Sequence, residues 1–138
     1  ISACLVGSEM CIRDRSNFVS LEIPKNNSVM FGSLSGTKLG VWVAHGEGKF
    51  EFPYEEKEYN IIAKYNYDGY PANPNGSPWS VAGVCSKDGR HLAMMPHPER
   101  AIFPWQCGYY PADRKENDEV TPWIEAFVNA RKWIENNK

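Results

Sequence analysis

Three stretches of the chain carry the hydrophobic pattern of β-strands. Apolar and polar residues alternate over residues 18–23, which predicts a half-buried strand. Residues 39–44 form a nearly continuous apolar run, typical of a strand buried on both faces. Residues 59–65 indicate a further strand. The pattern therefore predicts a sheet in the first half of the chain.

The second half of the chain predicts a hairpin and a terminal helix. Residues 80–85 and 91–95 are strand-like and flank a Lys-Asp-Gly-Arg turn. Thr121 has the chemistry of a helix cap, and Pro122 suits the first turn that follows it. Apolar residues then recur at helical spacing and predict the buried face of this helix: Trp123, Phe127, Ala130 and Ile134.

The composition is that of one globular domain or most of one. The chain has 138 residues, of which 42% are hydrophobic and 23% are charged, and its formal net charge is −2. No apolar run approaches the roughly 20 residues of a membrane span, and the charge gives no reason to expect nucleic acid as a partner. Cys85 and Cys107 are too few for a disulfide framework, which favours a reducing compartment. We therefore expect a cytoplasmic domain without a membrane or nucleic-acid partner.

Residues 94–100 carry the strongest chemical signal. His97 and Glu99 stand two positions apart and are flanked by prolines. Pro98 disfavours the helical conformation at His97, and side chains at i and i+2 of an extended segment point to the same side. Glu99 could then orient His97 as a general base. The alternative is a surface turn in which His97 is solvated and Glu99 pairs with Arg100.

Four further stretches stand in a fixed order with this segment: residues 42–50 (WVAHGEGKF), 70–78 (YPANPNGSP), 122–123 (PW) and 129–132 (NARK). Together they resemble the C-terminal end of the large, single-chain phosphoribosylformylglycinamidine synthases of de novo purine biosynthesis, from about Asn17 onward. Those enzymes end in a class I glutamine amidotransferase domain. The resemblance implies an α/β fold: the C-terminal portion of an incomplete, flavodoxin-like amidotransferase domain, with a mixed sheet, a hairpin and a C-terminal helix.

The resemblance also implies a Cys-His-Glu triad, to which His97 and Glu99 match directly. The family's cysteine lies upstream, on a strand-to-helix elbow in a G-x-C-x-G context. Cys85 is the nearest candidate, but Lys87 stands where the second glycine should be, and the Asp-Gly pair after it predicts a turn. We interpret Cys85 as a buried, inert strand cysteine and expect the chain to lack its nucleophile.

The first 15 residues have a different origin in our interpretation. Residues 5–14 can be back-translated into the transposase adapter used in sequencing libraries, read in one frame. A signal peptide is the competing interpretation, but the segment lacks a long apolar stretch and carries several charges. We therefore interpret residues 1–15 as adapter-derived and expect native sequence, residues 16–138, to resume near Ser16 or Asn17.

His45 and Glu47 are candidate substrate-binding residues. They follow the second predicted strand and stand among glycines that allow close backbone approach. The C-terminal end of a strand in an open α/β sheet borders the usual ligand crevice. One hypothesis places them in the glutamine pocket or at the interface that delivers ammonia; the alternative is a structural His45 packed in its loop. Because neither C-x₂-C nor H-x₃-H spacing occurs, no metal site is expected.

Two loops need separate interpretation. Residues 73–78 are dense in Asn, Pro and Gly, which favours an ordinary exposed turn, whereas the resemblance places them near the mouth of the active site. Residues 104–111 hold three aromatic residues just after the His-Glu pair. Because aromatic surface is costly to leave in water, we expect this loop to pack against the synthetase portion.

The function implied by the resemblance is that of a ligase with glutamine as amido-nitrogen donor. Glutamine and the synthetase domain of the same chain are the expected partners. No phosphate-binding signature occurs in the sequence, so no cofactor is expected here, and ATP and Mg²⁺ would belong to the synthetase portion. Without a nucleophile the segment alone is expected to be inactive. A degenerate binding or regulatory module and a separate small glutaminase subunit remain alternatives.

Overall fold

The computed structural model of the chain describes residues 15–46, 48–74 and 76–138. Apart from Arg15, the segment interpreted as adapter-derived lies outside the described residues. Glu47, one of the two candidate substrate-binding residues, also lies outside them.

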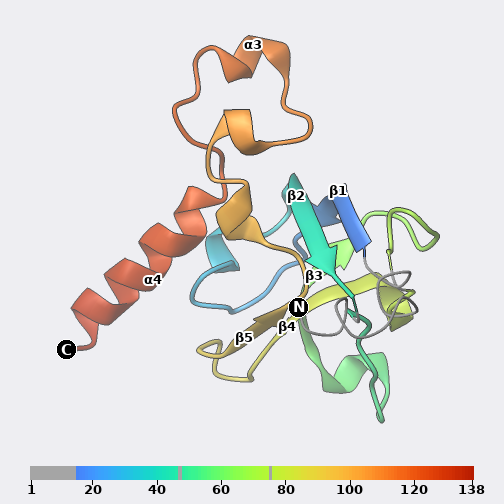
Figure 1. The fold of residues 1–138 in the computed structure, drawn as a ribbon. Coiled ribbons are helices and arrows are strands. Elements are labelled where there is room, and N and C mark those ends of the chain that lie inside the picture. Colours follow the sequence, from blue (N-terminus) through green and yellow to red (C-terminus); the bar gives the residue numbers. More distant parts are fainter. Residues whose placement is uncertain (1–14, 47, 75) are drawn as a thin grey trace, which may run out of the picture.

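The centre of the fold is an antiparallel sheet with the strand order β2-β1-β3-β4-β5 (Figure 1). Its strands are β1 (Arg15–Glu22), β2 (Lys38–His45), β3 (Asn60–Tyr65), β4 (Val81–Cys85) and β5 (Leu92–Met94). The three predicted strands and the predicted hairpin are therefore confirmed. All pairings between the described strands are antiparallel, in contrast to the mixed sheet that the resemblance implies.

The longest pairing joins β1 to β2 and shows which side chains of a strand face the core. Val41 and Val43 of β2 are fully buried in the core, whereas Trp42 between them is only half-buried. Trp42 points to the other face, where its ring meets Phe18 edge-on at 5.0 Å between centroids. The expectation that residues 39–44 are buried on both faces is therefore wrong. One face packs into the core, and the other is covered in part by Phe18 and by a loop.

The connections contain short helical turns, which are η1 (Gly32–Leu34), η2 (Glu56–Glu58), η3 (Pro78–Ser80), η4 (Pro98–Arg100), η5 (Pro104–Gln106) and α3 (Ala112–Lys115). The chain between β5 and the terminal helix leaves the sheet, rises to α3 and returns, as Figure 1 shows. We call residues 103–120 the arm. Most of its side chains are exposed, so the arm contributes little to the core.

The terminal helix α4 (Ile124–Asn136) begins later than the sequence predicts. The hydroxyl of Thr121 donates to the carbonyl of Ala101, and the helix has no side-chain cap, so the predicted capping role of Thr121 is wrong. The predicted buried face is also wrong at Phe127 and Ile134, which are 38% and 56% exposed, whereas Ala130 is half-buried. Trp123 and Ala126 join the start of α4 to the core, and the helix then runs away from the sheet (Figure 1).

Trp123 joins the start of α4 to the sheet. Its side chain is 1% exposed, its ring lies 5.8 Å from that of Phe31, and its indole Nε1 donates to the carbonyl of Gly40 at 2.8 Å. The other large side chains that share this core belong to the strands and to the segment around η1: Leu21, Ile23, Leu34, Val41, Val43, Ile62 and Tyr65. Trp123 is thus both a filler of the core and a hydrogen-bonded link to β2.

Replacing Trp123 with Ala should lower the free energy of unfolding by about 3–5 kcal/mol, because a large buried side chain leaves a cavity. Trp105→Ala is the matched control: its side chain is 73% exposed, and a change of about 0.5 kcal/mol or less is expected at such a surface position. Urea-induced unfolding followed by circular dichroism measures both variants. Equal losses of stability would contradict the packing described for Trp123.

Candidate functional site

His97 is positioned by the backbone at the point where the two outer strands of the sheet meet. Its N–H donates to the carbonyl of Trp42 at 2.8 Å, which forms an isolated antiparallel β-bridge. Trp42 lies in β2, whereas His97 follows β5 at the opposite end of the strand order. The backbone of His97 is therefore hydrogen-bonded to one edge strand, β2, while the chain reaches it from the other, β5.

Glu99 reaches His97 through a turn. Residues 98–100 form η4, closed by the N–H of Arg100 donating to the carbonyl of His97 at 3.1 Å. Within this turn the Glu99 side chain folds back, and its Oε1 lies 2.7 Å from His97 Nδ1. The contact expected from the sequence is present, but the expected extended backbone is wrong. Pro98 occupies the first position of the turn, where its fixed φ and missing N–H are tolerated.

The contact with Glu99 determines which nitrogen of the His97 imidazole carries the proton. A carboxylate only accepts hydrogen bonds, so Glu99 favours the tautomer with the proton on Nδ1 and leaves Nε2 to accept one. Glu99 Oε1 also lies 3.9 Å from Arg100 Nε, a longer contact than the one to His97. The shorter distance favours the paired arrangement over a solvated His97 beside a Glu99–Arg100 pair. The arrangement suits a general base whose orientation is set by a neighbouring carboxylate.

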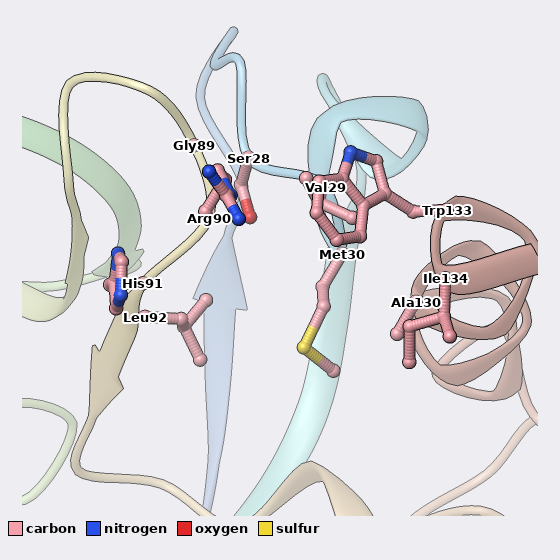
Figure 2. A pocket seen from close by; sticks show the side chains of 10 residues that line it. All are labelled: Ser28, Val29, Met30, Gly89, Arg90, His91, Leu92, Ala130, Trp133 and Ile134. Carbon is pink, nitrogen blue, oxygen red and sulfur yellow. The ribbon is translucent and has the colours of Figure 1, made fainter. Parts of the chain in front are cut away.

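An apolar cavity of about 290 Å³ opens beside the pair, between β5, the residues before η1 and the start of α4. Apart from His97 and Glu99, its lining includes Met30, Met94 and Phe127. A second groove of about 270 Å³ shares Met30 and Leu92 with it and lies between the hairpin and α4 (Figure 2). In that groove the guanidinium of Arg90 lies over the ring of Trp133, 5.0 Å from its centroid. The His-Glu pair thus lies at the wall of the first cavity and away from the second.

His45 is packed in its own loop at the end of β2. A Cβ atom on Gly48 would come within 2.5 Å of the His45 ring, so only glycine allows this contact. The β-bridge to His97 is made by Trp42, three residues earlier, which corresponds to about 10 Å along the strand. The structure does not bring His45 together with the His-Glu pair, and the packing on Gly48 supports the structural alternative.

Neither described cysteine lines the cavity beside the His-Glu pair. Cys85 lies in β4 opposite Leu92, at the turn end of the hairpin, so the strand position is as predicted although its side chain is half-buried rather than buried. The Cys107 thiol faces the carbonyls of Ala101 and Phe103 at 4.0 and 3.7 Å, and burial raises its pKa. A raised pKa reduces the thiolate that attacks or is alkylated at neutral pH.

Asn73 and Ser77, in the stretch 73–78, are joined by two hydrogen bonds. The side chain of Asn73 donates to the carbonyl of Ser77 at 3.0 Å and accepts the Ser77 N–H at 3.1 Å. Both residues are buried, so the expectation of an ordinary exposed turn is wrong for them. The hydroxyl of Ser77 also accepts the N–H of Phe50 at 3.2 Å, which ties this loop to the one after β2.

Trp42 belongs to the site although sequence reasoning did not single it out. In addition to the bridge, its indole Nε1 donates to the carbonyl of Gln106 at 2.7 Å. The only hint lies in its place within the WVAHGEGKF stretch, because no spacing rule links it to residues so far along the chain.

The described residues contain no group of three or more His, Cys, Asp or Glu side chains that could hold a metal ion. Within the same part of the chain, no helix has the length and apolar character required to cross a membrane.

Comparisons with known proteins agree on one family. The family described as CobB/CobQ-like glutamine amidotransferase domain matches residues 9–134. A protein of Arabidopsis thaliana named probable phosphoribosylformylglycinamidine synthase, chloroplastic/mitochondrial, is 42% identical over 137 residues, which cover 90% of this chain and 10% of that protein. The phosphoribosylformylglycinamidine synthase of Homo sapiens is 42% identical over 133 residues, which cover 88% of this chain and 10% of that protein. The chain thus spans about a tenth of the length of these relatives.

A solved structure has a similar fold. The structure titled "Structure of PurLQS from Thermotoga maritima" superposes with a TM-score of 0.65 at 23% identity. The match covers 88% of this chain and 49% of the solved chain. At this identity the likeness supports the fold alone, an α/β arrangement with a curled antiparallel sheet and few helices among the described residues.

Iodoacetamide should alkylate Cys107 more slowly in the folded chain at pH 7 than in urea, because burial raises the pKa of its thiol and limits access. The difference should narrow as the pH rises and the thiol deprotonates. Peptide-resolved mass spectrometry of the modified fraction over time measures both rates. Equally fast modification of folded and unfolded chain at pH 7 would show that Cys107 is a reactive thiol.

Proposed function

The chain belongs to the CobB/CobQ-like glutamine amidotransferase domain family, and from this membership we propose that it is part of the glutaminase of a phosphoribosylformylglycinamidine synthase in de novo purine biosynthesis. The observation that carries the proposal is the 2.7 Å contact between His97 Nδ1 and Glu99 Oε1. The much longer relatives support the large single-chain type over a separate small subunit. We expect the enzyme in the cytoplasm, although the name of the Arabidopsis relative places that protein in chloroplasts or mitochondria.

In the proposed reaction, His97 handles the protons and a cysteine thiol makes the covalent bond. His97 Nε2 takes the thiol proton, and the thiolate attacks the side-chain amide carbon of glutamine. The imidazolium then returns the proton to the amide nitrogen, so that ammonia leaves and a glutamyl thioester remains. Water hydrolyses the thioester to glutamate and restores the thiol. Because Cys85 and Cys107 are unsuited, we expect the nucleophile to lie outside the described residues.

Glu99 has two tasks in this cycle. It holds the imidazole in the tautomer that leaves Nε2 free to accept a proton, and it stabilises the imidazolium once His97 is protonated. Its side chain is 54% exposed, so solvent screens part of this charge interaction. We therefore expect orientation to be the larger of the two contributions.

The ammonia would be passed to a synthetase portion, which binds ATP and Mg²⁺ and converts formylglycinamide ribonucleotide to formylglycinamidine ribonucleotide. The described residues hold no phosphate-binding glycine motif, so we assign none of that chemistry to this chain. His45 stays a weaker proposal as a substrate-binding residue, and Glu47 is proposed with it on the sequence alone.

The arm is the surface we propose for contact with the synthetase portion. The rings of Phe103 and Trp105 stack at 5.9 Å with 8° between their planes, and the two side chains are 41% and 73% exposed. Tyr109, further along the arm, is 75% exposed. Exposed apolar surface of this kind is costly in water and marks interaction sites. The arm begins just after the His-Glu pair, where ammonia would leave for the synthetase.

In a full-length synthase that carries this domain, His97→Ala should lower glutamine-dependent synthesis by about 10²–10⁴-fold and change ammonia-dependent synthesis by about twofold or less. Free ammonia bypasses both steps that His97 serves. Glu99→Gln should give a milder loss, because an amide still accepts the imidazole N–H but does not stabilise the imidazolium as well. Steady-state rates with each nitrogen source measure both variants.

The ratio of the two activities decides between the proposals. A selective loss with glutamine supports the glutaminase. Equal loss of both activities in a folded His97→Ala protein would mean a structural role for His97. A wild-type protein with no glutamine-dependent activity would instead support the degenerate binding or regulatory module.

Trp105→Ala in the same full-length protein should raise the amount of glutamate released per formylglycinamidine ribonucleotide formed, because ammonia escapes where the arm no longer seals against the synthetase. Tyr54→Ala is the matched control, since Tyr54 is 70% exposed and lies outside the arm. Paired assays of glutamate and product give the stoichiometry. An unchanged ratio for Trp105→Ala would argue against the arm as the contact surface.

A further inference from the structure

Trp42 binds both ends of the segment that carries the His-Glu pair. Its carbonyl accepts the N–H of His97 at 2.8 Å, and its indole Nε1 donates to the carbonyl of Gln106 at 2.7 Å. The first residue of the segment 97–106 and its last residue are therefore fastened to one residue of β2.

Between these two ends the segment is held by its own turns. The N–H of Arg100 donates to the carbonyl of His97 at 3.1 Å, which closes η4. The side-chain oxygen of Gln106 accepts the N–H of Phe103 at 3.0 Å and closes η5. With both ends fixed and both turns closed, the backbone that presents Glu99 has little freedom to move relative to β2.

The anchor is itself immobilised by the sheet. Trp42 lies within the continuous β1–β2 pairing, directly opposite Phe18. The edge-on contact between the two rings, 5.0 Å between centroids, sets the direction in which the indole N–H points. The position of Gln106 is therefore set relative to β1 and β2, the two strands with the longest pairing in the sheet.

We propose that Trp42 is a positioning residue for the His97–Glu99 pair, an inference that rests on the proposed function and assigns to Trp42 no contact with substrate. Misplacement of a catalytic group by about 1 Å costs on the order of 10²-fold in rate. The carbonyl bond to His97 is available to any residue at position 42. The bond to Gln106 requires the indole N–H, and this bond is what makes tryptophan necessary here.

The substitution that isolates this bond is Trp42→Phe. Phenylalanine keeps an aromatic ring against Phe18 and keeps the backbone bridge to His97, but it has no N–H to donate. Trp123→Phe is the matched control, because it removes an indole bond of the same kind, from Trp123 Nε1 to the carbonyl of Gly40 at 2.8 Å, without touching the segment 97–106.

Both variants are made in the full-length synthase and assayed with glutamine and with ammonia. Trp42→Phe should lower the glutamine-dependent kcat by about 10- to 100-fold, with the KM for glutamine and the ammonia-dependent rate unchanged. Trp123→Phe should lower the unfolding temperature and leave the glutamine-dependent kcat unchanged. A merely structural role of Trp42 would instead lower both activities together.

The outcomes separate the positioning role from the proposed function. If His97→Ala abolishes glutamine-dependent synthesis and Trp42→Phe leaves its kcat unchanged, the inference about Trp42 falls and the glutaminase stands. Equal loss with both nitrogen sources, or a change confined to the KM for glutamine, would also overturn the positioning role. If His97→Ala has no selective effect, the proposed function fails, whatever Trp42→Phe does.

Discussion

The β-bridge between Trp42 and His97 is the interaction on which the site depends. In the strand order of the sheet, β2 and β5 are the outermost strands, and the bridge joins β2 to the chain directly after β5. The sheet must curl for these edges to meet, and the twist that strands naturally have makes such a curl favourable. The place of His97 is consequently a property of the whole sheet, because a shift in any of its pairings would move one side of the bridge.

The arm projects from two points that are hydrogen-bonded to other parts of the fold. Trp123 donates its indole N–H to Gly40, two residues before Trp42 on β2, and Thr121 holds the carbonyl of Ala101. The chain is thus hydrogen-bonded to β2 before the arm, at His97, and after the arm, at Trp123. On the side of the His-Glu pair, motion of the arm therefore meets the two hydrogen bonds of Trp42, whereas Trp123 secures the start of α4.

The sequence predicts well those structural features that depend on residues close together in the chain. The strands and the hairpin follow from local alternation and turn chemistry. The contact between His97 and Glu99 was predicted from their spacing, although a turn and not an extended backbone brings them together. The predictions were wrong where a contact with residues distant in the sequence determines the structure. Phe127 and Ile134 have the spacing of a buried face, yet they are exposed because α4 runs past the end of the core. Thr121 has the chemistry of a cap, but the carbonyl of Ala101, brought near by the fold, takes its hydroxyl instead.

The exposure of the pair adds a last constraint on how it works. His97 and Glu99 have side chains 30% and 54% exposed, although the backbone of His97 is hydrogen-bonded to β2. The main chain of His97 is therefore held in place, while its side chain stays accessible to an incoming group. With Nδ1 engaged by Glu99, only Nε2 can exchange a proton with an incoming group. In the proposed reaction, a nucleophile that approaches along the open side would meet a base already oriented, and reorganisation of the imidazole would then add little to the barrier of proton transfer.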